Sequence, residues 1–271
     1  MKIFGVDFTS APCRRKPITV ASAVLMKDLL RVEAIERHET FADFEQFLAR
    51  PGPWIGGFYF PFGLPAELCR DLGWPLEWKA LVSHCSSLTR QQLRCALDAY
   101  RNSRPAGSKY AHRATDLPAG SSSPMKLVNP PVALMFHEGA RRIAGAGVHV
   151  PALCDGDPHR VALEAYPGLL ARKQLGIRDS YKSDTTSRQN GLRKAARRRI
   201  VEALRAGHPL GIRVRLRDGL ERTVVGDGAA DLLDAVICAT QAAWAALRPR
   251  YGLPAGAFGA EGWIVSAGTS S

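Results

Sequence analysis

The sequence lacks any apolar run near the roughly 20 residues that a membrane-spanning helix needs. Its N-terminal segment, MKIFGVDF, also lacks the long apolar stretch and the cleavage site of a secretory signal. We therefore expect a cytoplasmic protein with no membrane partner.

The sequence also lacks the cysteine and histidine spacings that hold zinc or build a disulfide framework. Its six cysteines are scattered without a CxxC motif, and none of the seven histidines has ligand spacing. We expect free thiols and assign no histidine to a metal. The cysteines are Cys13, Cys69, Cys85, Cys95, Cys154 and Cys238.

Acidic residues are few compared with basic ones. The chain of 271 residues has 25 Asp and Glu against 37 Lys and Arg, a net charge of +12. This balance suggests a polyanionic partner. Hydrophobic residues make up 46% of the chain, which excludes a disordered or fibrous protein, and we expect one globular domain over residues 1–271.

The positive charge is concentrated in two segments. Residues 188–217 hold ten basic residues against Glu202, and residues 90–113 hold six against Asp98. A helix predicted over residues 188–206 has an apolar stripe that leaves most of its basic side chains facing solvent. Such a run is compatible with an ordinary solvated face. Because pairing acids are almost absent, we expect instead that it contacts a phosphate backbone of DNA or RNA, and we assign this role to Arg193, Lys194, Arg197 and Arg198. Aromatic residues do not interleave with this run, which argues against base stacking there.

Hydrophobic patterning predicts an α/β protein. Strands are expected at residues 2–8, 17–28, 29–38, 52–60 and 159–167, with a helix that begins after the N-cap Thr40 lying between the third and fourth. The first three strands, with a Lys27–Asp28 turn between the second and the third, are expected to form an antiparallel meander. The order of the elements indicates a mixed five-stranded sheet flanked by helices. Residues 101–124 form a predicted loop within a helical and loop insertion at about 78–135. Residues 258–266 are predicted to add a last strand.

Two carboxylates occur where apolar strand residues are expected. Asp7 ends the first strand, where its side chain could simply start a turn. Glu164 lies in the apolar strand VALEAYP, where an edge or surface position would also explain it.

Asp231 and Asp234 lie three residues apart at the start of a late helix, for which Asp227 is a predicted N-cap. Acids near a helix N-terminus are favoured by the helix dipole, and this explanation stays open. No charged residue follows between Asp234 and Arg248, so the helix is expected to be largely buried. Buried acids need a cation or donors, and Mg²⁺ or Mn²⁺ held by carboxylates would supply the cation.

The sequence resembles domain-of-unknown-function family 429, a group of predicted RNase H-like nucleases, and more distantly the RuvC-type resolvases. The matching segments are GVDFTS, GFYFPFGLP, LEAYPG, the D-x-x-D-A motif that begins at Asp231, and EGWI. The resemblance implies an RNase H-like fold with Asp7, Glu164, Asp231 and Asp234 as catalytic residues and metal ligands. The family commonly has an aspartate where this chain has Tyr59, which puts full two-metal catalysis in question.

Three functions follow from these observations. The leading one is a Mg²⁺- or Mn²⁺-dependent nuclease that hydrolyses phosphodiester bonds of nucleic acid. The alternative is a catalytically weak or inactive nucleic-acid-binding protein on the same fold, because Tyr59 replaces an acid. A phosphotransferase of the actin and sugar-kinase type is less favoured, because those enzymes normally need two such domains.

Overall fold

The computed structural model describes residues 1–256 and 259–268. Within them, one mixed sheet of seven strands has the order β5-β6-β4-β1-β2-β3-β7. The strands are β1 (Lys2–Asp7), β2 (Ile18–Met26), β3 (Leu29–His38), β4 (Trp54–Tyr59), β5 (Val148–His149), β6 (Asp157–Glu164) and β7 (Arg213–Leu216). The protein is therefore an α/β protein with a mixed sheet, as predicted.

The first three strands form the predicted meander, and β1 lies at the centre of the sheet. β1 pairs antiparallel with β2 and parallel with β4, and β4 pairs parallel with β6. The two strands that the hydrophobic pattern missed, β5 and β7, are short and lie at the two edges of the sheet. β7 alternates Arg213 and Arg215 with apolar residues and is only partly buried. Its two arginines kept it from being recognised as an apolar strand in the sequence.

The strand predicted for residues 258–266 is not found in the part of it that is described. Phe258 lies outside the described residues, and residues 259–266 contribute only an isolated parallel bridge between Ile264 and Glu164. The amide of Val265 donates to the carbonyl of Glu164, which ties this segment to the end of β6.

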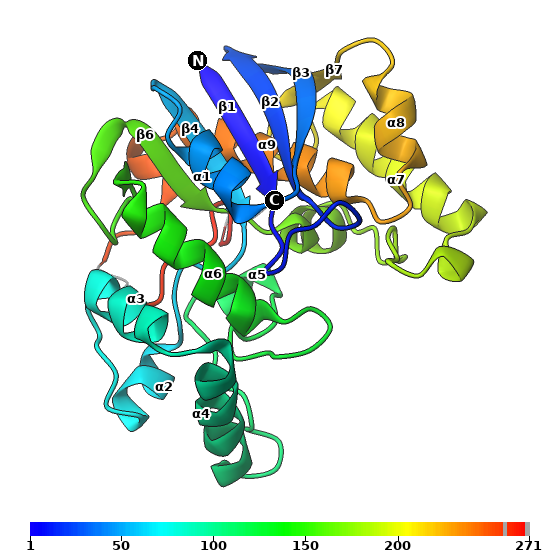
Figure 1. Cartoon of the computed structure of the whole chain (residues 1–271). Coiled ribbons are helices and arrows are strands. Elements are labelled where there is room, and N and C mark those ends of the chain that lie inside the picture. The colour runs from blue at the N-terminus through cyan, green and yellow to red at the C-terminus, as the bar shows by residue number, and fades with distance from the viewer. Residues whose placement is uncertain (257–258, 269–271) are drawn as a thin grey trace.

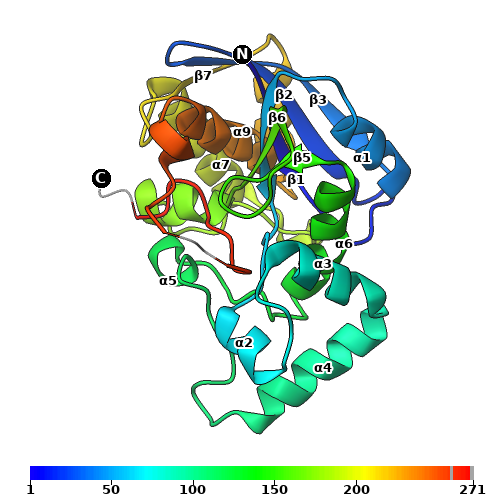
Figure 2. The ribbon, with the colours of Figure 1, turned by 90° about the vertical axis from the view of Figure 1, so that its left-hand side faces the viewer.

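Helices cover both faces of the sheet. They are α1 (Phe41–Leu48), α2 (Ala66–Asp71), α3 (Trp78–Ser87), α4 (Arg90–Ser103), α5 (Asp116–Ala119), α6 (Val132–Gly145), α7 (Gly191–Ala206), α8 (Leu220–Gly226) and α9 (Asp231–Ala246). Figure 2 shows α7 and α9 on one side of the sheet and α1 and α6 on the other, with α3 below the sheet and next to α6. The predicted N-cap Thr40 is confirmed by a capping box with Asp43 at the start of α1. None of the helices in the described ranges is long and apolar enough to cross a membrane.

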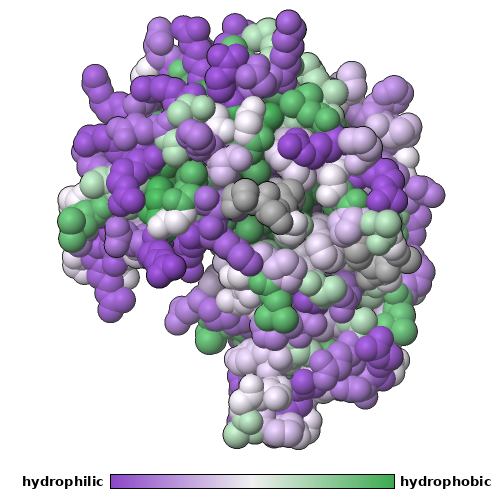
Figure 3. Space-filling model, turned by 180° about the vertical axis from the view of Figure 1, so that it is seen from behind, coloured by the Kyte–Doolittle hydropathy of each residue, from purple (hydrophilic) through white to green (hydrophobic). Residues whose placement is uncertain are grey.

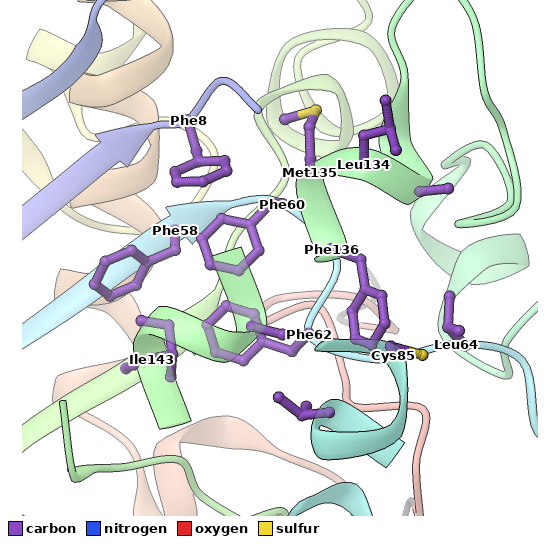
Figure 4. Packing of buried hydrophobic residues seen from close by; sticks show 14 of the residues in the cluster. Phe8, Phe58, Phe60, Phe62, Leu64, Cys85, Leu134, Met135, Phe136 and Ile143 are labelled. Atoms are coloured by element: carbon purple, nitrogen blue, oxygen red, sulfur yellow. The ribbon is translucent and has the colours of Figure 1, made fainter. Parts of the chain in front are cut away.

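A separate apolar core lies on each face. On the α6 face, phenylalanines from β1, β4 and the segment after β4 pack against α6 (Figure 4). Phe58 and Phe60 have ring centroids 6.1 Å apart, and Phe8 lies 4.7 Å from Phe60. These buried rings fix the carboxyl ends of β1 and β4 on this face.

On the opposite face, α9 packs directly on the sheet because two strands carry glycine at the contact. A Cβ atom on Gly5 of β1 would lie 2.0 Å from the carbonyl oxygen of Ala235, and one on Gly57 of β4 would lie 2.4 Å from that of Cys238. Any larger residue would push the helix away. The two glycines therefore bring the first turn of α9 close to the carboxyl end of β1.

The chain leaves the sheet after β4 and forms a long insertion before it returns through α6. Figure 1 shows α2, α4 and α5 beyond the carboxyl ends of β1 and β4. The predicted loop at residues 101–124 is largely irregular but contains the short helix α5. The insertion thus lies next to the carboxyl ends of the strands, where the predicted site residues Asp7 and Glu164 are found.

Candidate functional site

Asp7 lies at the carboxyl end of the central strand β1, with its side chain on the α9 face. The residue is only 6% exposed. Burial raises the pKa of its carboxyl group well above the ordinary range, and the charges of Asp231 and Asp234 raise that pKa further, whereas Lys182 and Lys16 lower it. The three acids are therefore close enough for their negative charges to repel one another, so the fold brings the carboxyl end of β1 next to the first turn of α9.

Asp231, the first residue of α9, pairs with a lysine from the turn after β1. The Lys16 ammonium donates to Asp231 Oδ1 at 2.6 Å and to Asp184 Oδ1 at 2.8 Å. Burial raises the pKa of Asp231, and the nearby Lys16 opposes this rise. One oxygen of Asp231 is thus committed to Lys16, while Oδ2 receives no hydrogen bond from any described donor.

Asp234 is almost completely buried at 1% exposure and has two partners from the segment before α7. The Tyr181 hydroxyl donates to Oδ1 at 2.6 Å, and the Lys182 ammonium donates to Oδ2. Burial alone would lower the pKa of Lys182, but Asp234 and neighbouring groups hold it well above the ordinary value. Neither partner was expected, because no periodicity or motif marks this segment in the sequence.

Glu164 points to the other face of the sheet. It stands in register with Phe58, which belongs to the α6-side core, whereas Asp7 follows Gly5 and Ile3 on the α9 side. Successive residues of a strand alternate between faces, so the side chains of Asp7 and Glu164 leave the sheet in opposite directions. Both side chains still border one cavity, which lies at the carboxyl ends of β1 and β6.

The partner of Glu164 is Arg113, which the insertion brings to the end of β6. The guanidinium donates to Glu164 Oε1 at 2.7 Å and to Oε2 at 2.8 Å, and the amide of Phe62 donates to Oε2 at 2.9 Å. Arg113 also pairs with Asp116 at 2.9 Å and donates to the carbonyl of Glu261 at 3.0 Å. Burial raises the pKa of Glu164, while Arg113 opposes the rise.

The start of α9 differs in one detail from the prediction. The N-cap is Ala230, which has a positive φ of 62°, and not Asp227. Asp227 still accepts hydrogen bonds from the amide of Ala229 at 3.2 Å, before the helix, and from the amide of Leu232 at 3.0 Å, in its first turn. The helix therefore begins at Asp231, four residues after the side chain that caps it. Asp231 is thus in the first turn, where it faces Lys16.

No group of three or more Asp, Glu, His or Cys side chains in the described part of the chain is arranged to hold a metal ion. The oxygens of Glu164 are already occupied by Arg113 and Phe62, and those of Asp234 by Lys182 and Tyr181. Asp7 differs, because neither of its carboxylate oxygens receives a hydrogen bond from a described donor. Asp7 and the free oxygen of Asp231 are thus the groups that best fit a cation.

A cavity of about 580 Å³ lies over these residues and contains five basic and four acidic side chains among its lining groups. Tyr59 and Tyr166 form part of its wall, with ring centroids 5.9 Å apart. Burial raises the pKa of both phenols, so both are neutral near pH 7. A second hollow of about 620 Å³, between β3 and α1, contains none of the predicted site residues.

The basic helix α7 was assigned four nucleic-acid-binding residues, and one of these assignments conflicts with the structure. Arg197 is 3% exposed, and its guanidinium donates to the carbonyls of Val225 and Tyr181 at 2.9 and 2.7 Å. Arg193 is half-buried and donates to Ser180 Oγ. Lys194 and Arg198 are exposed. Figure 3 shows hydrophilic side chains gathered at the upper left of the rear face, where α7 and α8 lie in that view.

Comparison with known proteins gives no further guide to the site. No family model matches the chain, and no curated protein or solved structure matches it. The resemblance to domain-of-unknown-function family 429 and the roles that it implies therefore stay predictions.

Proposed function

We propose that the protein is a metal-dependent nuclease that hydrolyses phosphodiester bonds with one Mg²⁺ or Mn²⁺ ion bound by Asp7 and Asp231. The observation that carries this proposal is the buried carboxylate of Asp7, which lies among the charges of Asp231 and Asp234 and accepts no hydrogen bond from a described group. Burying an ionised acid beside two others is costly unless a cation compensates it. Mg²⁺ commonly uses one or two carboxylates together with water and substrate phosphate oxygens.

This proposal uses fewer ligands than the sequence predicted. Glu164 is omitted because Arg113 and Phe62 already satisfy its oxygens. Asp234 is also omitted as a ligand, because Lys182 and Tyr181 occupy its oxygens. Its negative charge still raises the pKa of Asp7. When bound, the ion would lower the pKa of a water molecule and stabilise charge on the phosphate.

We also propose that the five longer strands, β1 to β4 and β6, form an RNase H-like sheet and that β5 and β7 extend its edges. The site would then lie at the carboxyl ends of parallel strands, where ligands bind in open α/β sheets. Exposed basic residues such as Lys194 and Arg198 would contact the phosphate backbone away from the reaction centre.

A second candidate function is nucleic-acid binding without cleavage. It is favoured by Tyr59, which lies beside Asp7 where the resemblance leads us to expect an acid, and by the lysines that already neutralise Asp231 and Asp234. On this alternative, the ion pairs are permanent and no metal enters.

Cleavage of labelled single-stranded, duplex and branched DNA and RNA with Mg²⁺ or Mn²⁺ tests the proposal. Asp7→Asn and Asp231→Asn should each reduce cleavage by about 100-fold or more, since a bound ion contributes several kcal/mol to the transition state. Asp179→Asn is the matched control, because that side chain is 74% exposed and lies outside the cavity. Equal cleavage by all variants, or none by the wild type under any condition, would refute the nuclease. Nucleic-acid binding that persists without cleavage would support the second candidate.

A further inference from the structure

The cavity beside Asp7 also indicates which kind of nucleic acid the proposed nuclease would accept, an inference that rests on the proposed function. We infer that the cavity takes one unstacked nucleotide of a single strand, with its base against Tyr59 and Tyr166 and a phosphate near Lys126 and Arg172. Duplex DNA or RNA would enter the cavity only after a nucleotide had left the helical stack, and it would otherwise contact only exposed basic residues outside the cavity.

The aromatic wall is the first observation. Tyr59 ends β4 and Tyr166 follows β6, so two neighbouring parallel strands bring the rings together at 5.9 Å with an angle of 44° between their planes. Both residues are partly exposed and border the cavity. Aromatic side chains of this kind stack on unpaired bases with little dependence on sequence. The basic helix α7 has no comparable pair, so base contact is expected in the cavity and not on that helix.

The second observation is a pair of cations among the residues that line the same cavity. Lys126 and Arg172 border the cavity, and neither forms an ion pair with a described residue. By contrast, Lys16, Lys182 and Arg113 are each committed to an acid. Arg172 lies close enough to Tyr166 for its charge to act on the phenol. Two uncommitted cations in the same cavity as an aromatic pair suit a phosphate joined to a stacked base.

The third observation is the shape that the insertion gives to the site. Residues 129–132, which include Pro130 and Pro131, line the cavity with Ser121, Ser122 and Met135 and face the carboxylates from the insertion side. The cavity volume of about 580 Å³ lies within the range of roughly 300–1,000 Å³ that pockets for small ligands occupy. A pocket of this size accepts a nucleotide that has been turned out of its strand, and a stacked base pair has no equivalent access.

Equilibrium binding without catalysis tests this inference. Fluorescence anisotropy of the full chain in EDTA would compare labelled 10-nucleotide single strands of DNA and RNA with a blunt duplex of the same sequence, and unlabelled dTMP and UMP would serve as competitors. We expect one type of single strand to bind at least about tenfold more tightly than the duplex, and the matching mononucleotide to displace it. A duplex that binds as tightly as both single strands would overturn the inference.

Substitution of Tyr166 separates stacking from general attraction. Tyr166→Leu should weaken single-strand binding by about 5- to 100-fold, the change that corresponds to losing one stacked base, and should leave duplex binding within about twofold. Tyr166→Phe should bind as the wild type does. The matched control is Tyr110→Leu, since Tyr110 lies in the insertion but outside the cavity. Equal effects of the Tyr166→Leu and Tyr110→Leu substitutions would contradict the inference.

Arg172→Ala keeps the test decisive if Tyr166→Leu does not fold, as judged by circular dichroism. This variant should weaken binding and reduce the dependence of log K on log salt by about 0.7, the value for one phosphate contact on a single strand. An unchanged slope would count against the phosphate position. Binding is measured in EDTA, so it does not depend on cleavage. Single-strand binding in EDTA together with no cleavage in Mg²⁺ or Mn²⁺ would contradict the proposed nuclease and leave the pocket assignment intact.

Discussion

Asp7 and Tyr59 are direct neighbours in the sheet, paired in register at the carboxyl ends of the parallel strands β1 and β4. Their side chains lie on the same face, which α9 covers. Tyr59 therefore occupies the position from which an acid on β4 would reach the ion that we propose Asp7 binds. The Lys182 ammonium lies 5.1 Å from the Tyr59 ring and connects this position to Asp234.

We predict that Tyr59→Asp increases Mn²⁺-dependent cleavage by about tenfold or more, because a third carboxylate beside Asp7 would strengthen ion binding. The substitution should lower thermal stability in EDTA, where the added charge is uncompensated. Cleavage rates and melting curves with and without Mn²⁺ measure both effects. Tyr59→Asn is the control of similar size without charge, and an equal gain in that variant would show that the carboxylate is not responsible.

Asp7 is expected to reduce the stability of the folded protein near neutral pH. Its pKa in the folded state is raised above the ordinary value of 3.8, so the folded state binds more protons than the unfolded one between these values, and stability falls as pH rises through this range. We predict that Asp7→Asn melts a few degrees higher than the wild type at pH 7, with each kcal/mol raising Tm by about 2–4 °C. The difference should vanish near pH 3, where both side chains are neutral. Calorimetry across this range checks the sign, and a lower Tm for Asp7→Asn at pH 7 would contradict the assignment.

Arg113 is expected to hold the insertion against the sheet. Arg113→Met would leave Glu164 and Asp116 buried without their cation, which typically costs about 3–5 kcal/mol. The loss should shrink as pH falls toward the ordinary pKa of Glu164, because the uncompensated acid then takes up a proton. Denaturant unfolding at pH 5 and 7 measures this change. Lys109→Ala, on the exposed part of the same loop, should change stability by less than about 0.5 kcal/mol. Adding Glu164→Gln to Arg113→Met should recover part of the loss.

The basic residues of α7 should separate into two classes. Lys194→Ala and Arg198→Ala should weaken nucleic-acid binding evenly across sequences, and the double variant should reduce the salt slope by about 1.4 on single strands. Arg197→Ala should mainly lower stability, because its guanidinium satisfies two buried carbonyls. Binding titrations at several salt concentrations, with melting curves of each variant, distinguish these outcomes. An Arg197→Ala variant that is fully stable but no longer binds would reverse the classification.

Most of the sheet could be predicted from the sequence, because apolar strands, turns and helix caps are each encoded by residues close together in the chain. The apolar strands and the Lys27–Asp28 turn predict the meander, and Thr40 predicts the start of α1 through its capping box. The glycines of β4 lie in a segment that the sequence already identified as a strand. The sequence also placed Asp7 at a strand end and Asp231 and Asp234 on a buried helix. The strand β7, by contrast, was not predicted, because two of its four residues are arginines.

Only the tertiary structure decided which acids meet and what neutralises them. Whether Glu164 shares a face with Asp7 depends on the register between β4 and β6, which involves residues more than 100 positions apart. Pairings over such distances leave no periodicity in a single sequence, so the partners Arg113, Lys16 and Lys182 could not be found from it. The sequence by itself determined the residue types and the order of the five longer strands, β1 to β4 and β6, along the chain. Two long-range contacts decided which charges meet at the site. One is the packing of α9 against Gly5, and the other is the ion pair that Arg113 of the insertion forms with Glu164 of β6.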